Sequence, residues 1–437
     1  MNTQNKLYFY LYIIFLTAFL LFNYYQNIFY SHSNNIFMTL FIILSSFIFP
    51  LILKHWKYQF NFKIITLFFI FRLLFSFSTP FFEDDYFRYI VEGQMIQNNI
   101  NPYLISPLEF GFGYTMVEDR KFFGDYLYHY SLKTGFPTLT AIYPPVIIYL
   151  FSFIKSPIQL TLFYLLLETI LILLLCLYIN KLSKNKSKNY KLLYLWYLHP
   201  LVLYEGYLNK HYDLLIGLFI LASIVFYNDF KNKIHTLFFA LAIHFKGYAI
   251  IYLPFFKKSR WNILLLWSFI EILSYLWYPS RFLKKSSINT FINQWEFNNG
   301  LFTTLRIYLE TIYPFEQSLL YTRYIFLTLF FILFFISFYY WYKNKIDQFI
   351  FLLITLIFFI CSPVANPWYF LMSVPFFINY SNNYKHHFFL SILSFYYLFY
   401  ISYDPLNSLL IISFISWFIL SISFFSKNIK RLNPLVH

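Results

Sequence analysis

The chain has 437 residues, of which 59% are hydrophobic and only 12% carry a formal charge. Soluble proteins carry about 25% charged residues, so this composition excludes an ordinary water-soluble domain and predicts a protein of the lipid bilayer. The net charge of +15 does not indicate a nucleic-acid partner. The Lys and Arg residues form short clusters between apolar runs, as in the cytoplasmic loops of membrane proteins.

Apolar runs of about 20 residues, the length of a helix that crosses about 30 Å of hydrocarbon, recur along the chain. Helices satisfy their own backbone hydrogen bonds in lipid, so we predict an all-α fold, a single polytopic transmembrane domain over residues 1–437. Basic clusters assign the sides of the membrane and place both termini in the cytoplasm. The expected spans, about 12 in number, are residues 7–25, 36–53, 63–78, 158–179, 190–204, 212–228, 261–278, 318–341, 346–362, 369–380, 387–402 and 407–425.

The longest polar stretch follows the third span. Residues 79–141 hold eight acidic and four basic residues, and their net negative charge in a basic chain places them outside the cytoplasm. Residues 142–154 are apolar but short, and a crossing there would put the lysines of residues 181–191 outside. We therefore expect an external interfacial helix at 142–154. Residues 79–157 become the first long external loop, and residues 279–317 become the second.

Residues 236–256 are apolar, yet both of their flanks are basic and Lys246 lies in the middle. A broken, re-entrant pair of half-helices fits both observations, because irregular backbone is tolerated at depth where it lines a cavity. The alternative, in which residues 236–256 cross the membrane once, remains open. A lysine at such a depth is costly and usually pairs, reaches the interface or binds an anion.

Three adjacent acids, Glu83, Asp84 and Asp85, come directly after the third span. A carboxylate at the membrane surface can act as a general base toward a hydroxyl, and Asp84 and Asp85 together can bind a divalent cation. Arg88 can pair with either of them or face a phosphate. Composition alone favours a simpler interpretation, a solvated helix start stabilised by the helix dipole. No cofactor is assigned, and a divalent cation stays open.

Three other motifs carry polar or aromatic groups. Tyr143 precedes two prolines, which is typical of a helix start. His211 and Asp213 lie at the edge of the span 212–228, where a polar group requires a partner or a function. Trp368 and Tyr369 end an external turn, where aromatic residues ordinarily form the interfacial belt.

The acidic segment after the third span resembles the signature of bacterial GT-C mannosyltransferases. Asp84-Asp85-Tyr86-Phe87-Arg88-Tyr89, then Glu92-Gly93 and Asn101-Pro102-Tyr103, is similar to their D-D-x-x-R-Y-x-x-D-G…N-P-Y pattern. Glu92 stands where Asp is usual.

The remaining motifs follow in the same order as in that family. Residues 143–145 resemble the Y-P-P motif, and residues 210–213 resemble a G-H-x-D motif in which Lys210 stands where Gly is usual. This departure leaves donor and acceptor specificity open. The resemblance extends over about residues 80–375, with further family-order matches at Lys246, Trp295, residues 298–300 and residues 367–369.

The resemblance implies a GT-C type hexosyltransferase of the bacterial cytoplasmic (inner) membrane. Such an enzyme moves a sugar, mannose in the family, from a polyprenyl-phosphate carrier to a hydroxyl of a glycan or lipid-linked acceptor on the extracytoplasmic side. The resemblance places the general base on Asp85, with Asp84 as its partner or alternative. The substrate-binding residues that it implies are Arg88, Tyr143, His211, Asp213, Lys246, Trp368 and Tyr369.

Two other classes of protein are to be weighed against an enzyme. A transporter or flippase for a lipid-linked sugar is expected to show inverted repeats and paired broken helices, whereas this sequence has one broken segment and no internal repeat. In a non-catalytic scaffold of envelope assembly, the clustered acids would have no evident role. A transporter is expected to tolerate Asp85→Asn, and a transferase is not.

Overall fold

The computed structural model of the protein describes residues 3–26, 32–55, 62–80, 84–116, 124–184, 186–228, 233–256, 259–282, 287, 290, 294–296, 300–343, 350–364 and 366–380. Within these ranges the chain is helical and forms no β-strand, which confirms the predicted all-α class. The chain divides into two units. The first comprises Met1–Lys57, Trp295–Phe370 and Tyr380–His437, and the second comprises Tyr58–Gln294 and Leu371–Asn379.

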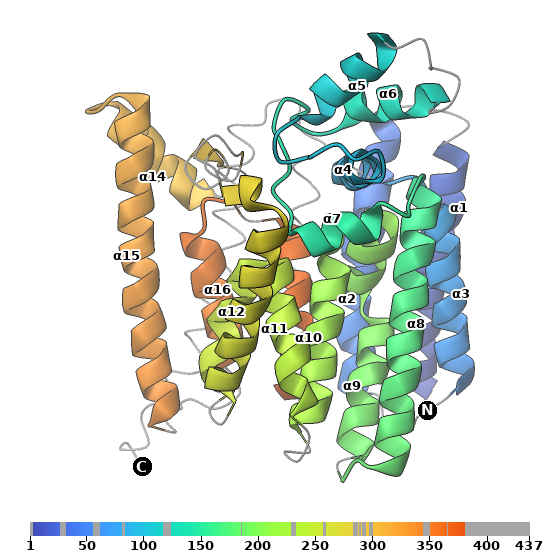
Figure 1. Ribbon diagram of the computed structural model, residues 1–437. Coiled ribbons are helices and arrows are strands. Elements are labelled where there is room, and N and C mark those ends of the chain that lie inside the picture. Colours follow the sequence, from blue (N-terminus) through green and yellow to red (C-terminus); the bar gives the residue numbers. More distant parts are fainter. Residues whose placement is uncertain are drawn as a thin grey trace. The chain divides into compact units, whose positions relative to one another are not determined.

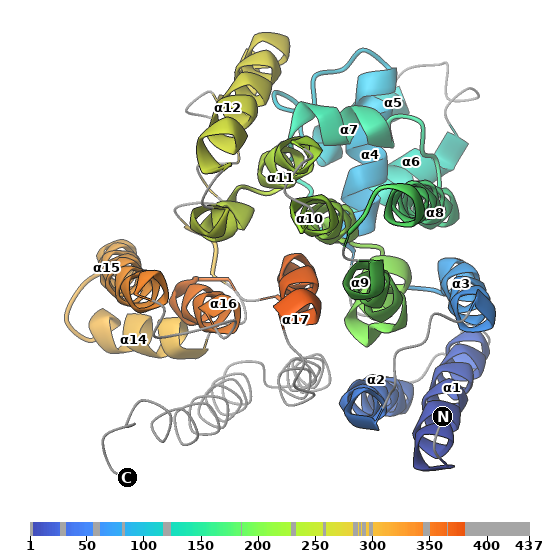
Figure 2. The same ribbon diagram turned by 90° about the horizontal axis from the view of Figure 1, so that it is seen from below.

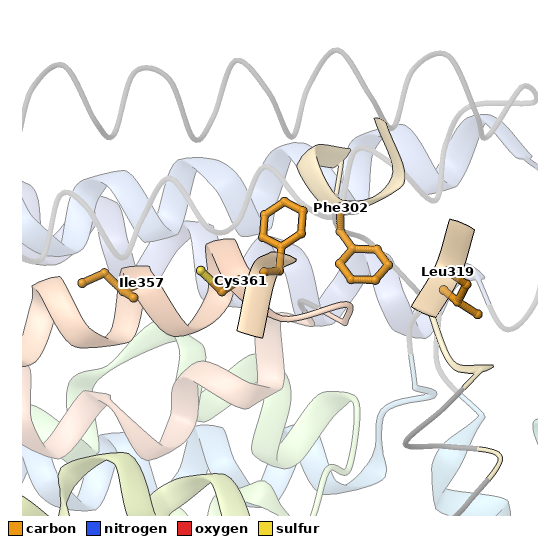
Figure 3. Close-up of a cluster of buried hydrophobic side chains, with 5 residues drawn as sticks. Phe302, Leu319, Ile357 and Cys361 are labelled. Carbon is orange, nitrogen blue, oxygen red and sulfur yellow. The ribbon is translucent and has the colours of Figure 1, made fainter. Parts of the chain in front are cut away.

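The first unit contains a helical pair at its N-terminal end, α1 (Thr3–Gln26) and α2 (His32–His55), whose rings Tyr12 and Phe49 lie 6.2 Å apart. It also contains α14 (Gly300–Glu310), α15 (Phe315–Tyr342) and α16 (Ile350–Cys361). These three helices share an apolar core, most of which Figure 3 shows, formed by Phe302, Leu319, Phe326, Ile357 and Cys361. The 3₁₀ helix η4 (Pro367–Met372) begins in this unit and ends in the second, and helix α17 (Val374–Tyr380) belongs to the second unit except for Tyr380.

The second unit holds the remaining described elements. They are α3 (Phe62–Phe77), α4 (Asp85–Gln97), α5 (Pro107–Met116), α6 (Gly124–Lys133), α7 (Pro145–Phe151), α8 (Pro157–Lys181), α9 (Lys186–Leu198), η1 (Val202–Leu208), α10 (Asp213–Tyr227), α11 (Ile234–Phe245), η2 (Gly247–Phe255), α12 (Arg260–Trp277) and η3 (Pro279–Phe282). Helix α10 packs against α8, α9 and α11 (Figure 2). Nearly all of its side chains are buried. Helices α4 to α7 lie together at one end of the long helices α8, α10 and α11 (Figure 1).

Local sequence signals explain several boundaries in this unit. Helix α7 begins at Pro145, because proline fits the first turn of a helix, and it covers only seven residues of the predicted segment 142–154. Helix α8 begins after Ser156, whose hydroxyl accepts a hydrogen bond from the backbone N–H of Gln159 at 3.2 Å. Helix α9 ends at Leu198, two residues before Pro200, and the π-helix η1 takes over. The predicted span 190–204 thus corresponds to the end of α9, a break at His199 and the start of η1; the break arises because proline disfavours helix at the residue before it.

A buried ion pair ties four elements of the second unit together. Arg72 Nε on α3 lies 2.6 Å from Glu168 Oε2 on α8, and both side chains are fully buried. The indole N–H of Trp196 on α9 and the hydroxyl of Tyr207 on η1 each donate to Glu168 at 2.5 Å. Sequence reasoning missed this pair, although each charge is isolated within an apolar run, the signal of a partnered residue.

The segment that contains α11 and η2 reverses direction at Lys246. Helix α11 ends at Phe245, Lys246 has an extended backbone, and η2 follows as a 3₁₀ helix. The two ends of the segment meet: His235 Nε2 lies 2.6 Å from the hydroxyl of Ser259. A rise of about 1.5 Å per residue in α-helix and about 2.0 Å in 3₁₀ helix makes the two arms similar in length. This geometry favours the re-entrant pair over the single crossing that the sequence left open.

Apolar helices indicate that the protein associates with a membrane. Three helical segments of the described residues are long and apolar enough to cross one: Leu7–Tyr24, Pro157–Lys181 and Phe315–Tyr342. Shorter apolar helices lie at Leu40–Ile52, Asp213–Tyr227 and Ile234–Phe245. This result does not confirm about 12 spans, and the last two predicted spans, 387–402 and 407–425, lie outside the described residues.

Candidate active site

Asp84 and Asp85 stand at the N-terminus of α4, where the helix dipole favours negative charge. Asp84 is exposed and Asp85 is partly buried. Burial and the adjacent charge of Asp84 raise the pKa of Asp85 to about 6, against the opposing effect of the cations Arg88 and Lys246. A carboxylate with this pKa is ionised at neutral pH and more basic than an ordinary aspartate. It can therefore take up a proton from a hydroxyl.

Arg88 does not pair with Asp84 or Asp85, as the sequence allowed, because Glu92 lies one helical turn away on the same face of α4. The Nη1 of Arg88 donates to Glu92 Oε1 at 2.8 Å and to the carbonyl of Leu139 at 3.1 Å. Its Nη2 donates to the carbonyls of Gly135 and Phe136 at 2.7 and 2.6 Å. Both terminal nitrogens thus hold the 135–139 loop against α4, and substrate binding by Arg88 stays a prediction.

Glu92 and Gly93 form the acid–glycine pair of the first motif. Glu92 is fully buried, and burial raises its pKa to about 7 despite the bond from Arg88. Its Oε2 has no hydrogen-bond partner among the residues that the structure describes. A Cβ on Gly93 would lie 2.4 Å from the carbonyl carbon of Phe151, so only glycine lets α4 lie this close to the end of α7.

The Asn-Pro-Tyr and Tyr-Pro-Pro motifs bind each other. The side-chain oxygen of Asn101 accepts a bond from the N–H of Tyr103 at 3.0 Å, which closes a tight turn. The hydroxyl of Tyr103 then donates to the carbonyl of Tyr143 at 2.6 Å. Asn101 also donates to the hydroxyl of Ser280 at 2.9 Å, so residues of both predicted external loops meet here.

Three tyrosine rings join α4 to the other polar motifs. The ring centroids of Tyr89 and Tyr143 lie 5.2 Å apart, those of Tyr143 and Tyr212 lie 5.1 Å apart, and those of Tyr89 and Tyr212 lie 5.4 Å apart. All three side chains are buried. The cluster brings the start of α7 and the turn before α10 to the face of α4, four residues from Asp85.

Asp213 and Lys246 form a buried ion pair beside this cluster. Lys246 Nζ lies 2.6 Å from Asp213 Oδ1, and the hydroxyl of Tyr248 donates to the same oxygen at 3.1 Å. Lys246 Nζ also lies 5.3 Å from the centroid of the Tyr212 ring. The second oxygen of Asp213 has no hydrogen-bond partner in the described part of the chain. The pair therefore offers both a cation and an acceptor atom for a ligand.

His211 lies in the turn between η1 and α10. Its Nε2 lies 3.7 Å from Glu205 Oε2, and both side chains are fully buried. The residue before it, Lys210, has a φ of 63°, the left-handed conformation that glycine adopts freely and other residues adopt at a cost of about 1–2 kcal/mol. The left-handed backbone explains why glycine is usual at this position of the motif. Lys210 adopts the same conformation at a cost in conformational energy.

The structure thus brings together Asp84, Asp85, Arg88, Tyr143, His211, Asp213 and Lys246 within the second unit. Trp368 and Tyr369 are buried in η4 and belong to the first unit, so their assignment to substrate stays a prediction. The described residues contain no group of three or more His, Cys, Asp or Glu side chains placed to hold a metal ion. Glu83, Asn298 and Asn299 lie outside those residues.

A comparison with protein families bears on this site directly. Residues 55–260 match the family model described as MptA_B family, alpha-(1->6)-mannopyranosyltransferase, N-terminal domain. The predicted resemblance to a GT-C type mannosyltransferase family is confirmed over this stretch. The stretch includes every predicted site residue except Trp368 and Tyr369. No curated protein and no solved structure matches the chain.

The family match supports a glycosyltransferase. An enzyme of this kind takes a sugar donor and an acceptor. The geometry of the second unit is compatible with that chemistry, because a carboxylate of raised basicity and a buried lysine–aspartate pair lie on elements joined by the tyrosine cluster.

Proposed function

We propose that the protein transfers a mannosyl group from a polyprenyl-phosphate carrier to a hydroxyl of a glycan or lipid-linked acceptor. The observation that carries this proposal is the position of Asp85 at the N-terminus of α4, four residues before Tyr89, whose ring packs against Tyr212 beside the Asp213–Lys246 pair. A base, a cation and a second carboxylate are the groups that such a transfer uses.

In the proposed reaction, the Asp85 carboxylate accepts the proton of the acceptor hydroxyl as its oxygen attacks the anomeric carbon. The bond between that carbon and the carrier phosphate breaks, and the electron pair stays on the phosphate. Lys246 is the cation that stabilises the developing negative charge. His211 is a second candidate only as a hydrogen-bond donor, because burial lowers its pKa well below its usual value and leaves the ring neutral. The terminal nitrogens of Arg88 already donate to Glu92 and to three backbone carbonyls.

The proposed setting is the bacterial inner membrane, with several crossings and both termini in the cytoplasm. The basic clusters between apolar runs support this orientation. The acidic loop and α4 then face the extracytoplasmic side, where a lipid-anchored donor can reach Asp85 while its tail stays in the bilayer.

The proposal is tested with membranes that contain the full chain, incubated with polyprenyl-phosphate carriers bearing different labelled sugars. We expect label from the mannosyl carrier to move to an acceptor, and Asp85→Asn to abolish this transfer without changing the amount of protein inserted. Lys133→Gln, an exposed substitution on α6, is the matched control. Normal transfer by Asp85→Asn would refute the assignment of the base.

A transporter or flippase remains the second candidate, because the broken pair α11–η2 is a feature that transporters share. The two functions differ in their products. A flippase moves the intact labelled lipid between leaflets of a vesicle, and it tolerates Asp85→Asn. A transferase releases the carrier phosphate and forms a new glycosidic bond.

A further inference from the structure

Lys210 combines two unfavourable features, a left-handed backbone and a buried side chain. Two backbone hydrogen bonds close the turn around it. The N–H of Asn209 donates to the carbonyl of Tyr204 at 2.8 Å, and the N–H of His211 donates to the backbone carbonyl of Glu205 at 2.9 Å. Such a closure at the end of a helix requires one left-handed residue, which is usually glycine. Lysine at φ 63° therefore costs backbone energy that glycine avoids. The side chain of Lys210 is expected to supply something that glycine cannot.

The Lys210 ammonium group reaches the C-terminal end of α3. Its Nζ donates to the carbonyl of Ser78 at 3.1 Å and to that of Ser76 at 3.4 Å. The last carbonyls of a helix have no partner within the helix. Burial lowers the pKa of Lys210 to about 7, and its amino group supplies N–H donors to these carbonyls in either protonation state. The hydroxyl of Tyr164 on α8 lies 3.4 Å from the carbonyl of Lys210 and can donate to it, which fixes the lysine from its other end.

This contact joins two parts of the candidate site. Ser78 is six residues before Asp84, and Lys210 holds the chain where it leaves α3. On its other side, Lys210 is followed directly by His211 and lies three residues before Asp213. A single side chain therefore fixes the end of α3, from which the chain continues toward Asp84 and Asp85, to the turn that carries His211 and Asp213.

We propose that Lys210 is a positioning residue, which sets the acidic segment of α4 against the Asp213–Lys246 pair. It touches no substrate. Its effect on catalysis rests on the proposed function, but its effect on the start of α4 does not. Three substitutions separate the contributions: Lys210→Gly removes the backbone cost and the contact, Lys210→Met removes only the contact, and Lys210→Arg keeps a cation of similar reach.

Hydrogen–deuterium exchange of the full chain in membranes tests the positioning directly. We expect Lys210→Met and Lys210→Gly to speed amide exchange over residues 84–90, and Lys210→Arg to restore slow exchange. Lys181→Met, an exposed lysine at the end of α8, is the control. Unchanged exchange in both Lys210→Met and Lys210→Gly overturns the proposal, whatever the protein's activity is.

Transfer kinetics give the second arm. We expect Lys210→Met and Lys210→Gly to lower kcat about tenfold with KM within about twofold, because the acceptor still binds while the base is misplaced. Lys210→Arg is expected to recover most of kcat. If kcat is normal in Lys210→Met, or if kcat, KM and the unfolding temperature all deteriorate together in Lys210→Gly, the positioning role is refuted. Absence of transfer by the wild type refutes the proposed function instead, and leaves the exchange result to decide the role of Lys210.

Discussion

Lys246 and Asp213, 33 residues apart in the chain, form an ion pair of 2.6 Å whose aspartate is almost fully buried. Removing one partner of a buried pair leaves an uncompensated charge, which costs about 3–5 kcal/mol. We expect Lys246→Met to lower the free energy of unfolding by this order and to abolish transfer.

A double substitution separates the two effects of that change. Lys246→Met with Asp213→Asn removes both charges. We therefore expect most of the lost free energy of unfolding to return, while transfer stays absent. Thermal unfolding in detergent and the labelled-carrier assay measure the two quantities. Recovery of transfer in the double variant would show that neither charge takes part in the reaction.

The pH dependence of transfer follows from Asp85. Its carboxylate works as a base only when deprotonated, and its pKa is raised to about 6. Activity is therefore expected to be full well above pH 6 and to fall as the pH is lowered through about 6.

The acid limb of this profile is expected to move in Asp84→Asn. The charge of Asp84 is one cause of the raised pKa of Asp85, so its removal lowers that pKa and shifts the limb toward lower pH. The pH profile of kcat/KM for the wild type and Asp84→Asn measures the shift. An unmoved limb would argue that Asp85 is not the titrating base.

Gly93 is expected to be intolerant of any side chain. A Cβ there would lie 2.4 Å from the backbone of Phe151, and backbone cannot move aside as a flexible side chain can. We expect Gly93→Ala to destabilise the protein by about 1–3 kcal/mol, measured by thermal unfolding. Gly247→Ala is the matched control, because no atom of the described residues, apart from Gly247, its two chain neighbours and the backbone of its own helix, lies within 4 Å of its Cβ position. Equal stability of the two variants would contradict this close approach of α4 and α7.

The predicted orientation of the membrane segments can be measured with reporters. A reporter fused after Phe110, on α5, is expected to be external, and one fused after Lys186, at the start of α9, is expected to be cytoplasmic. Cysteine accessibility at the same positions gives an independent measurement. The opposite pattern would place Asp85 on the cytoplasmic side and exclude the proposed site of transfer.

Much of the fold could be predicted because apolar length is a local signal. The run 158–179 became α8, Pro157–Lys181, and the interruption at Lys246 became the break between α11 and η2. The ion pair of Arg72 with Glu168 could not be predicted in the same way, because its partners are 96 residues apart and only tertiary packing brings them together.

The residues of the candidate site could be predicted from the sequence, but most of the hydrogen bonds between them could not. The motifs named Asp85, His211, Asp213 and Lys246. The i,i+4 spacing of Arg88 and Glu92 was a local signal of their pair, but no local signal indicated that Arg88 also donates to three carbonyls of the 135–139 loop. The left-handed backbone of Lys210 had one sequence signal, the glycine usual at its place in the motif. That signal indicates the backbone conformation, and only the structure gives the contact with the end of α3.

Together with the predicted span 63–78, the Arg72–Glu168 pair has a consequence for the insertion of the chain into the membrane. Arg72 leaves the ribosome long before Glu168, and an unpaired arginine at the centre of a bilayer costs about 2.5–3.5 kcal/mol during insertion. We expect α3 to stay beside the insertion machinery until α8 arrives. Shorter nascent chains, in which α3 but not α8 has left the ribosome, therefore release α3 poorly, and longer chains, in which α8 has also left the ribosome, release it well. In Arg72→Leu the shorter chain is expected to insert as readily as the longer one, which crosslinking of α3 to lipid or to the machinery can measure; equal release of the two wild-type chains would contradict this coupling. During biosynthesis, the release of α3 into the lipid is then delayed until α8, which carries the acid that neutralises Arg72, has been translated.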